Sequence, residues 1–260
     1  MKNIILDREV LLVFTIVLFL VLSGCKQQTG IRTSETDEAV VINTKQYMVE
    51  IQKEGFRYGF KLPDGGSIAE AHPVSGLQIS RSDAPLSDVE STKLIDNSDD
   101  QITLLVTTDN GLQAEIRMSF FPHTVKLEVQ PKDKEKYNIA TRTAGLTPSY
   151  GLADHAAFGG GEWDRGVRAS TDLTGFEMNP LRGYRMISNF VIFPQQGFAE
   201  VSIEPDDKIV RLNEQENVQG SRNVNSMPAM HYFIGSPKEI YHSFLDVRNK
   251  EGYPVYKPKY

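Results

Sequence analysis

Cysteine is nearly absent from this chain, which has only Cys25 among its 260 residues. A single cysteine excludes any disulfide within the chain, so the fold depends on its apolar core. Positive charge is also outnumbered, because the chain has 28 Lys and Arg against 34 Asp and Glu, which gives a net charge of −6. A protein that follows nucleic-acid phosphates needs a basic stripe, and this composition argues against nucleic acid as a partner. The five histidines show no metal-ligand spacing, so we predict neither a metal site nor a cofactor.

Long hydrophobic runs are equally rare, and the longest is the 13-residue stretch Val10–Leu22. It is too short for a membrane-spanning helix but has the length of a secretory signal, and Lys2 and Arg8 precede it. The Ser23-Gly24-Cys25 sequence that follows resembles the lipobox of bacterial lipoprotein signal peptides. The resemblance implies cleavage before Cys25, lipidation of this residue and attachment to a membrane of the bacterial cell envelope. An uncleaved anchor or a free thiol is the alternative.

Composition divides the chain into four segments. Residues 1–24 are the expected lipoprotein signal peptide, and residues 25–45 are polar and predict a flexible tether. Residues 46–235 are long enough for one large β domain. Residues 236–260 are predicted to form a helix followed by a linker with two prolines in an aromatic, extended stretch.

From Tyr47 onward, apolar and polar residues alternate with a period of two, as they do in half-buried strands. Turn signals separate these runs, and Asn110-Gly111 predicts a tight antiparallel hairpin. Residues 81–100 are acidic and rich in Ser and Asp, so a solvated loop is expected there. The pattern predicts an all-β fold, a large antiparallel β-sandwich. Ten strands are expected at 47–52, 56–62, 102–108, 112–121, 124–129, 137–143, 188–193, 198–203, 208–212 and 229–234.

One helix is predicted after the last strand. Ser236-Pro237-Lys238-Glu239 has a capping serine, a proline at the first helical position and a glutamate at the third. The apolar residues Ile240, Phe244 and Val247 then recur at helical spacing. This stripe predicts either core packing or a contact with a following domain.

Residues 144–183 differ from the rest, since they hold eight of the 20 glycines and the only tryptophan. Long ordered loops in compact domains are usually binding loops or lids. An aromatic ring can cover the C–H face of a sugar while planar acceptors and donors bind its hydroxyls. We therefore predict substrate binding by six residues of this segment: Asp154, His155, Phe158, Glu162, Trp163 and Asp172.

The order of motifs resembles glycoside hydrolase family 31. Tyr150-Gly151-Leu152 precedes the glycine-rich loop and Thr171-Asp172, and Met227–Glu239 is similar to the strand that leads into a short helix in that family. The resemblance runs from about Tyr47 to the C-terminus and implies the family's N-terminal, galactose-mutarotase-like sandwich. It also implies an α-glycoside as ligand and a (β/α)₈ barrel as partner, with the loop 152–176 reaching over the barrel mouth. The family motif Tyr-Gly-Leu-Gly-Glu ends here in Ala153-Asp154, and the shorter Asp154 changes that contact.

The family hydrolyses α-glycosides by a retaining mechanism that uses two aspartates of the barrel. No barrel follows Tyr260 in this sequence, so we assign no catalytic residue and expect the chain alone to be inert. The chain is then the front piece of a longer or split enzyme, or a stand-alone carbohydrate-binding surface lipoprotein. A mutarotase-like epimerase is a third reading, which needs a paired His and Glu that nothing in the sequence specifies.

Several candidate residues also have structural interpretations. Asp154 and His155 could form a carboxylate–imidazole pair, but adjacent side chains on a strand point apart, which favours a loop-structuring role. Glu162 could bind sugar hydroxyls or pair with Arg165 on a solvated rim. His231 lies on an alternating strand, which is typical of an interior histidine rather than a catalyst.

Overall fold

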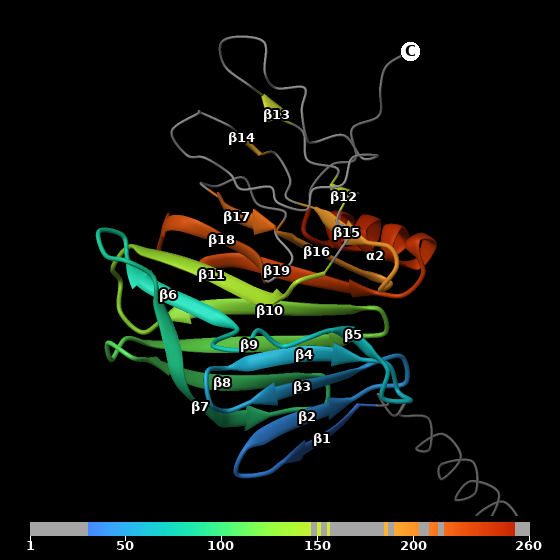
Figure 1. The fold of residues 1–260 in the computed structure, drawn as a ribbon, viewed down its shortest axis with the longest axis horizontal. Helices are drawn as coiled ribbons and strands as arrows, with labels where there is room; N and C mark the ends of the chain where they lie inside the picture. Colours follow the sequence, from blue (N-terminus) through green and yellow to red (C-terminus); the bar gives the residue numbers. More distant parts are fainter. Residues whose placement is uncertain are drawn as a thin grey trace, which may run out of the picture. The chain divides into compact units, whose positions relative to one another are not determined.

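The computed structural model of the chain describes residues 31–146, 150–151, 155–156, 185–186, 190–202, 208–212 and 216–252. The strands among these residues form sheets of five, twelve and two strands, and every pairing between named strands is antiparallel (Figure 1). The described part of the chain contains one helix, α2 (Pro237–Lys250). The predicted all-β architecture with a C-terminal helix is therefore confirmed.

The five-stranded sheet is a meander in sequence order, and it forms because its strands alternate apolar and polar residues. Val40, Ile42, Val49 and Ile51 are fully buried on one face. Its strands are β1 (Arg32–Glu35), β2 (Ala39–Asn43), β3 (Met48–Gln52), β4 (Arg57–Lys61) and β5 (Ser67–Ala69).

The tether predicted over residues 25–45 is wrong from Arg32 onward. Residues 32–35 and 39–43 are strands β1 and β2, and β2 pairs with β3 from Ala39↔Gln52 to Asn43↔Met48. The short apolar run Val40-Val41-Ile42 places Val40 and Ile42 in the core, which outweighs the polar residues around it. The first residues of the predicted tether lie outside the described part of the chain.

The twelve-stranded sheet carries most of the remaining strands, in the order β12-β15-β16-β19-β10-β9-β8-β7-β6-β11-β18-β17. A separate ribbon pairs β13 (His155–Ala156) with β14 (Arg185–Met186). The strands of the large sheet are β6 (Leu77–Arg81), β7 (Ser87–Asn97), β8 (Gln101–Thr108), β9 (Gln113–Phe121), β10 (Thr124–Pro131), β11 (Tyr137–Ala144), β12 (Tyr150–Gly151), β15 (Val191–Phe193), β16 (Phe198–Ser202), β17 (Lys208–Leu212), β18 (Glu216–Val224) and β19 (Met227–Ile234).

Four strands of this sheet, β6, β7, β12 and β18, are not among the predicted ones. The loop expected over residues 81–100 is largely strand β7, which pairs with β8 along most of its length. Strand β18 was not predicted, because polar side chains occur on both of its faces. The Asn110-Gly111 hairpin is confirmed, since β8 and β9 pair on either side of it and Gly111 has φ +83°.

Aromatic side chains join the two large sheets into a sandwich. Tyr58 and Phe60 of β4 contact Tyr232 of β19, with ring centroids 5.8 and 5.2 Å apart. The Tyr58 and Tyr232 hydroxyl oxygens are 2.6 Å apart, and the Tyr47 hydroxyl donates to the Phe121 carbonyl oxygen at 2.8 Å. These buried hydroxyls therefore have partners inside an otherwise apolar core.

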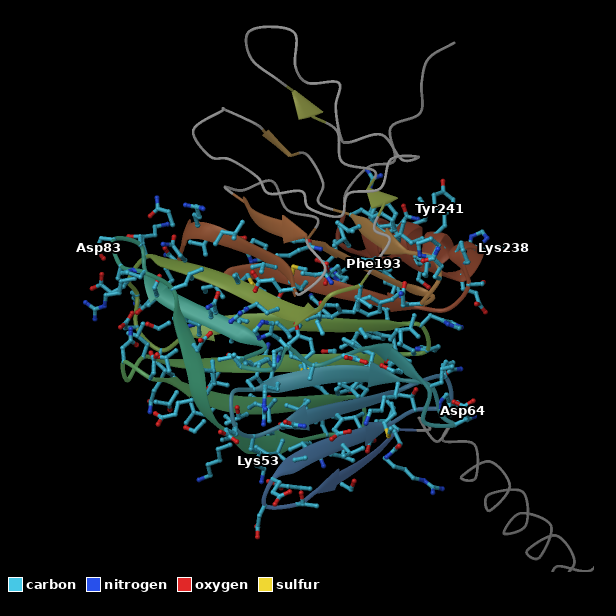
Figure 2. All side chains as sticks on the ribbon, in the orientation of Figure 1. Lys53, Asp64, Asp83, Phe193, Lys238 and Tyr241 are labelled. Atoms are coloured by element: carbon cyan, nitrogen blue, oxygen red, sulfur yellow. The ribbon has the colours of Figure 1, made fainter. Side chains whose placement is uncertain are left out.

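Helix α2 covers the outer side of β16 and β19. Ser236 and Glu239 form the predicted capping box, in which the Ser236 N–H donates to Glu239 Oε2 at 2.8 Å. Ile240 and Phe244 pack against Val201 and Phe233, while Lys238 and Tyr241 project from the helix into solvent (Figure 2). Among the described residues no helix has the length and apolarity needed to cross a membrane.

Candidate functional site

Most of the sequence-predicted site lies outside the described residues. Asp154, Phe158, Glu162, Trp163 and Asp172 belong to that group, and so does the predicted lipidation residue Cys25. The backbone of His155 is described, and it pairs with Met186 in the β13–β14 ribbon. The predicted sugar contacts of the loop 152–176 therefore stay predictions.

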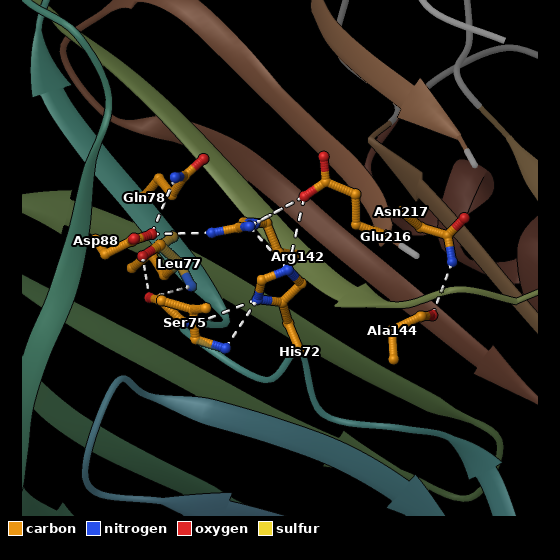
Figure 3. A network of polar contacts seen from close by, with 10 residues as sticks. His72, Ser75, Leu77, Gln78, Asp88, Arg142, Ala144, Glu216 and Asn217 are labelled. Atoms are coloured by element: carbon orange, nitrogen blue, oxygen red, sulfur yellow. Dashed lines mark hydrogen bonds and ion pairs between the residues drawn. The ribbon is translucent and has the colours of Figure 1, made fainter. Parts of the chain in front are cut away.

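The described residues contain a charged cluster that sequence reasoning missed, made of His72, Asp88, Arg142 and Glu216 (Figure 3). Its backbone frame is the loop between β5 and β6, which runs along β11. The Arg142 N–H donates to the Gly76 carbonyl oxygen at 2.8 Å, and the Ala144 N–H donates to the Glu70 carbonyl oxygen at 2.9 Å. Ala71 forms an isolated bridge with Thr143, which places His72 beside Arg142.

Sheet register brings the charged side chains of the cluster to one face. Arg142 of β11 lies opposite Val218 of β18, and Glu216 is two residues away on the same side of β18. Asp88 of β7 lies opposite Gln78 of β6, and the Gln78 amide donates to Asp88 Oδ1 at 2.9 Å. Arg142 is 54 to 74 residues from its three partners in the sequence, so no local motif predicts the cluster.

The Arg142 guanidinium is the centre of the cluster. Nη1 donates to Asp88 Oδ1 at 2.9 Å, and Nη2 and Nε donate to Glu216 Oε2 at 3.0 and 3.2 Å. The side chains of Arg142 and Glu216 are 12% and 14% exposed, whereas that of Asp88 is 34% exposed at the rim. A guanidinium held by two carboxylates has a fixed orientation, and each of its hydrogen bonds is charge-assisted.

His72 adds an uncharged imidazole to the cluster. Its Nδ1 lies 3.2 and 3.3 Å from the backbone nitrogens of Val74 and Ser75, and its Nε2 lies 2.8 Å from Arg142 Nη2. A neutral ring accepts a hydrogen bond on one of these two sides. Burial and the Arg142 charge lower the pKa of His72, against the opposing effects of Glu216 and Asp88. The ring is therefore neutral at neutral pH, with Nε2 3.6 Å from Glu216 Oε2.

The opposite face of the same two strands is buried and also polar. Thr141 and Thr143 of β11 lie opposite Gln219 and Asn217 of β18, and all four side chains are almost fully buried. They face the interior, where Thr141 lies close to the Tyr232 hydroxyl. This placement requires the large sheet to curl, because five strands separate β11 from β19 in the sheet order.

Glu200 of β16 belongs to this interior layer and was also missed from sequence. It lies opposite Tyr232 of β19 and is 2% exposed. Burial raises the pKa of Glu200 to about 7, and the neighbouring Gln219 side chain opposes this shift. The sequence signal was a single charged residue within the apolar run Phe198–Ile203.

The arrangement sets limits on the chemistry of the described residues. In this part of the chain no group of three His, Cys, Asp or Glu side chains could hold a metal ion. The Arg142 cluster offers fixed N–H donors, carboxylate acceptors and a neutral imidazole. These are hydrogen-bonding groups suited to a polar ligand, and they also tie the β5–β6 loop to β7, β11 and β18.

Comparisons with known proteins identify no family. The sequence matches no protein-family model and no curated protein. Among solved structures, YidC from Thermotoga maritima aligns over 85% of this chain and 56% of its own, with 10% identity and a TM-score of 0.45. An Escherichia coli K12 protein assigned as an aldose 1-epimerase aligns over 80% of this chain and all of its own, with 8% identity and a TM-score of 0.49.

A further solved structure is a family 31 sulfoquinovosidase from E. rectale, which aligns over 79% of this chain and 32% of its own. Its identity is 8% and its TM-score is 0.40. The chain thus spans about half of the YidC chain and a third of the sulfoquinovosidase chain.

Proposed function

We propose that the chain is the sugar-binding β-sandwich of a protein similar to the family 31 α-glycosidases. In this proposal lipid on Cys25 holds it at the bacterial cell envelope, and its partner is a catalytic (β/α)₈ barrel in the same or a separate chain. One observation carries the sugar-binding role. The Arg142 guanidinium is fixed by Asp88 and Glu216 beside the neutral ring of His72.

Sugar hydroxyls both donate and accept hydrogen bonds, so their sites combine fixed donors with fixed acceptors. Arg142 supplies donors in one plane, and Glu216 and Asp88 supply acceptors that are already oriented by it. Asp88 is partly exposed, while Arg142 and Glu216 are more buried. An uncharged ligand suits this cluster, because its charges are already paired with one another.

The C-terminal elements agree with the motif on which the family resemblance rests. Strand β19 ends at Ile234, and the capping box of α2 begins at Ser236. This is the strand-to-helix step that the Met227–Glu239 motif predicts. It supports the proposed likeness and adds nothing about the choice of sugar.

The test is calorimetric titration of the purified full chain, in mild detergent, with methyl α-glucoside, methyl α-galactoside and methyl α-xyloside. We expect at least one of these sugars to bind and Glu216→Gln to weaken its binding at least tenfold, since a charge-assisted hydrogen bond contributes about 1.5–3 kcal/mol. Glu35→Gln is the matched control, because Glu35 lies on β1 and is 44% exposed. Absence of binding, or equal affinities in both variants, would reject the proposal.

A hydrolysis assay distinguishes the sandwich alone from a complete glycosidase. Since the family's catalytic aspartates lie on the barrel, the chain alone should release no sugar from aryl α-glycosides. Release above the blank would show that the chain itself is catalytic. If no barrel is encoded beside this chain, the stand-alone surface lipoprotein becomes the better description of the same binding function.

A second candidate function is the interconversion of sugar anomers, favoured by the 3.6 Å approach of His72 Nε2 to Glu216 Oε2. In this reaction a base takes the proton of the anomeric hydroxyl, the bond from C1 to the ring oxygen breaks, and the ring oxygen gains a proton. Reclosure on the other face of the carbonyl gives the second anomer. Polarimetry of fresh α-glucose tests it, and a rate equal to the spontaneous rate would reject this function and leave sugar binding intact.

A further inference from the structure

A groove with a volume of about 320 Å³ lies between α2 and the β9–β10 hairpin, away from the Arg142 cluster. Helix α2 covers β16 and β19 with its apolar side, through Ile240 and Phe244. Its flank over β10 carries Ser243, Asp246, Val247 and Lys250, which share one helical face because they are three or four residues apart. The opposite wall and floor come from Phe121, Pro122, His123, Thr124, Lys126 and His231.

The groove combines one aromatic surface with hydrogen-bonding groups. Phe121 is 43% exposed, although its carbonyl oxygen is tied to the Tyr47 hydroxyl in the core. The Lys250 ammonium lies 5.9 Å from the Phe121 ring centre, a surface contact that a ligand can displace. The hairpin thus presents a large apolar ring on a backbone that is held in place.

The polar groups of the groove include both signs of charge and two imidazole rings. His123 donates from Nδ1 to the Ile234 carbonyl oxygen at 2.9 Å, and its Nε2 lies 4.0 Å from Glu239 Oε1. Lys126 pairs with Glu251 at 3.1 Å, and the same Glu251 oxygen lies 3.7 Å from His231 Nε2. Asp246 is exposed on the helix side.

His231 is the most deeply buried of these groups, at 3% exposure. Burial lowers its pKa to about 4, with Lys126 acting in the same direction and Glu251 and the Ala229 backbone opposing, so the ring is neutral. Its Nε2 faces Glu251 in the groove wall, so the ring adds a buried polar group to this lining.

We propose that this groove is a second carbohydrate-binding site, which holds one neutral pyranose ring against Phe121. The ring's C–H face covers the aromatic surface, while Asp246 accepts from its hydroxyls and Lys126 donates to them. The volume is at the lower end of the range for small-molecule sites, which suits a single ring. The two lysines of the groove are balanced by Asp246 and Glu251, which favours an uncharged ligand. The inference rests on the proposed sugar-binding function and adds a location to it.

The experiment is titration of the purified full chain with the same three methyl α-glycosides, followed by saturation-transfer NMR. Phe121→Ala and Asp246→Asn remove the ring and one acceptor of the groove, and both residues are exposed. We expect each variant to lose one of two binding sites, with affinity at that site reduced at least tenfold. Tyr241→Ala and Asp83→Asn are the matched controls, because both residues are exposed and neither lines the groove (Figure 2).

The outcomes distinguish the two proposals. Binding that Glu216→Gln abolishes and that Phe121→Ala and Asp246→Asn leave unchanged would overturn the groove site and keep the Arg142 cluster. Binding that only the groove variants abolish would overturn the Arg142 cluster and keep the groove. Two sites with separate sensitivities support both, and absence of binding to all three sugars overturns both.

Discussion

Burial drives the titratable side chains of the sandwich toward their uncharged forms. It lowers the pKa of His72 and His231 and raises that of Glu200. Neighbouring charges modify these shifts without reversing them, as Glu216 does at His72 and Glu251 does at His231. Uncharged imidazole is therefore present in both the Arg142 cluster and the groove at neutral pH, which suits hydrogen bonding to hydroxyl groups.

The raised pKa of Glu200 predicts how the free energy of unfolding of the sandwich depends on pH. A carboxyl group with a pKa of about 7 in the folded state and about 4.5 when unfolded binds its proton more firmly in the folded protein. This stabilisation is fully present below pH 4.5 and is lost as the pH rises through 7. Since one pKa unit corresponds to about 1.4 kcal/mol, the loss amounts to roughly 3 kcal/mol. The titratable groups facing Glu200 are Tyr58 and Tyr232, whose pKa values burial raises, so they stay neutral over this range.

Glu200→Gln removes this titration, and urea unfolding at pH 4.5 and pH 8 measures the effect. We expect the variant to gain about 3 kcal/mol relative to the natural protein between the two pH values. Glu54→Gln, at an exposed position, should leave the pH dependence unchanged. Parallel pH profiles for Glu200→Gln and the natural protein would contradict the assignment.

At the scale of elements, the sequence predicted those whose signals are local. The Asn110-Gly111 hairpin depends on two residues and the α2 cap on Ser236 and Glu239, and the structure has both. Strand β7 was missed because most of its residues are polar and it lies within an acidic, Ser- and Asp-rich stretch, and β18 was missed because Asn217 and Gln219 are polar and buried. Hydrophobic alternation cannot identify a strand whose interior face is polar.

The candidate site was harder to predict than the fold for a related reason. His72, Arg142 and Glu216 belong to a loop and two strands, and their approach depends on the pairing of β11 with β18 and on the Ala71–Thr143 bridge. Residue spacing in a single sequence cannot predict such a contact. The glycine-rich loop was detectable because its composition is unusual over a continuous stretch.

Close contact between β11 and β18 leads to a prediction at Gly220. A Cβ atom on Gly220 would lie 2.1 Å from the Ile139 carbonyl oxygen and 2.6 Å from Ala140 Cα, so the two strands would have to separate. We expect Gly220→Ala to destabilise the sandwich by at least 2 kcal/mol, about the upper range of ordinary single substitutions, and to loosen the Arg142–Glu216 contact. Thermal unfolding measures the first effect.

Gly66→Ala is the control for this substitution. Its Cβ would meet the Asp64 side chain at 3.3 Å and the Leu62 side chain at 3.4 Å, in an exposed turn. The change should stay within about 0.5 kcal/mol, as is usual for surface positions. Equal losses in the two variants would show that β11 and β18 tolerate a wider spacing than the structure gives them.

At the scale of the whole molecule, the described residues carry two polar surfaces on different elements. The outer face of β11 and β18 carries the Arg142 cluster, and the groove beside α2 carries Phe121 and Asp246. The buried polar layer around Glu200 and Tyr232 lies between the sheets.

The proposed lipid attachment to the envelope predicts the chemical form of the mature N-terminus. If Cys25 is the lipidated residue, expression in a bacterium with the natural leader should yield a protein that begins at Cys25 and carries lipid on both thiol and amino group. Several acyl chains suffice for stable membrane attachment, whereas one chain is marginal. The Cys25→Ser variant should therefore be absent from the membrane fraction or retain residues 1–24. Intact-mass spectrometry detects the retained residues. The sandwich should unfold at the same temperature in both forms, because the described strands begin at Arg32. A chain that retains residues 1–24 with a free Cys25 thiol would instead support an uncleaved anchor.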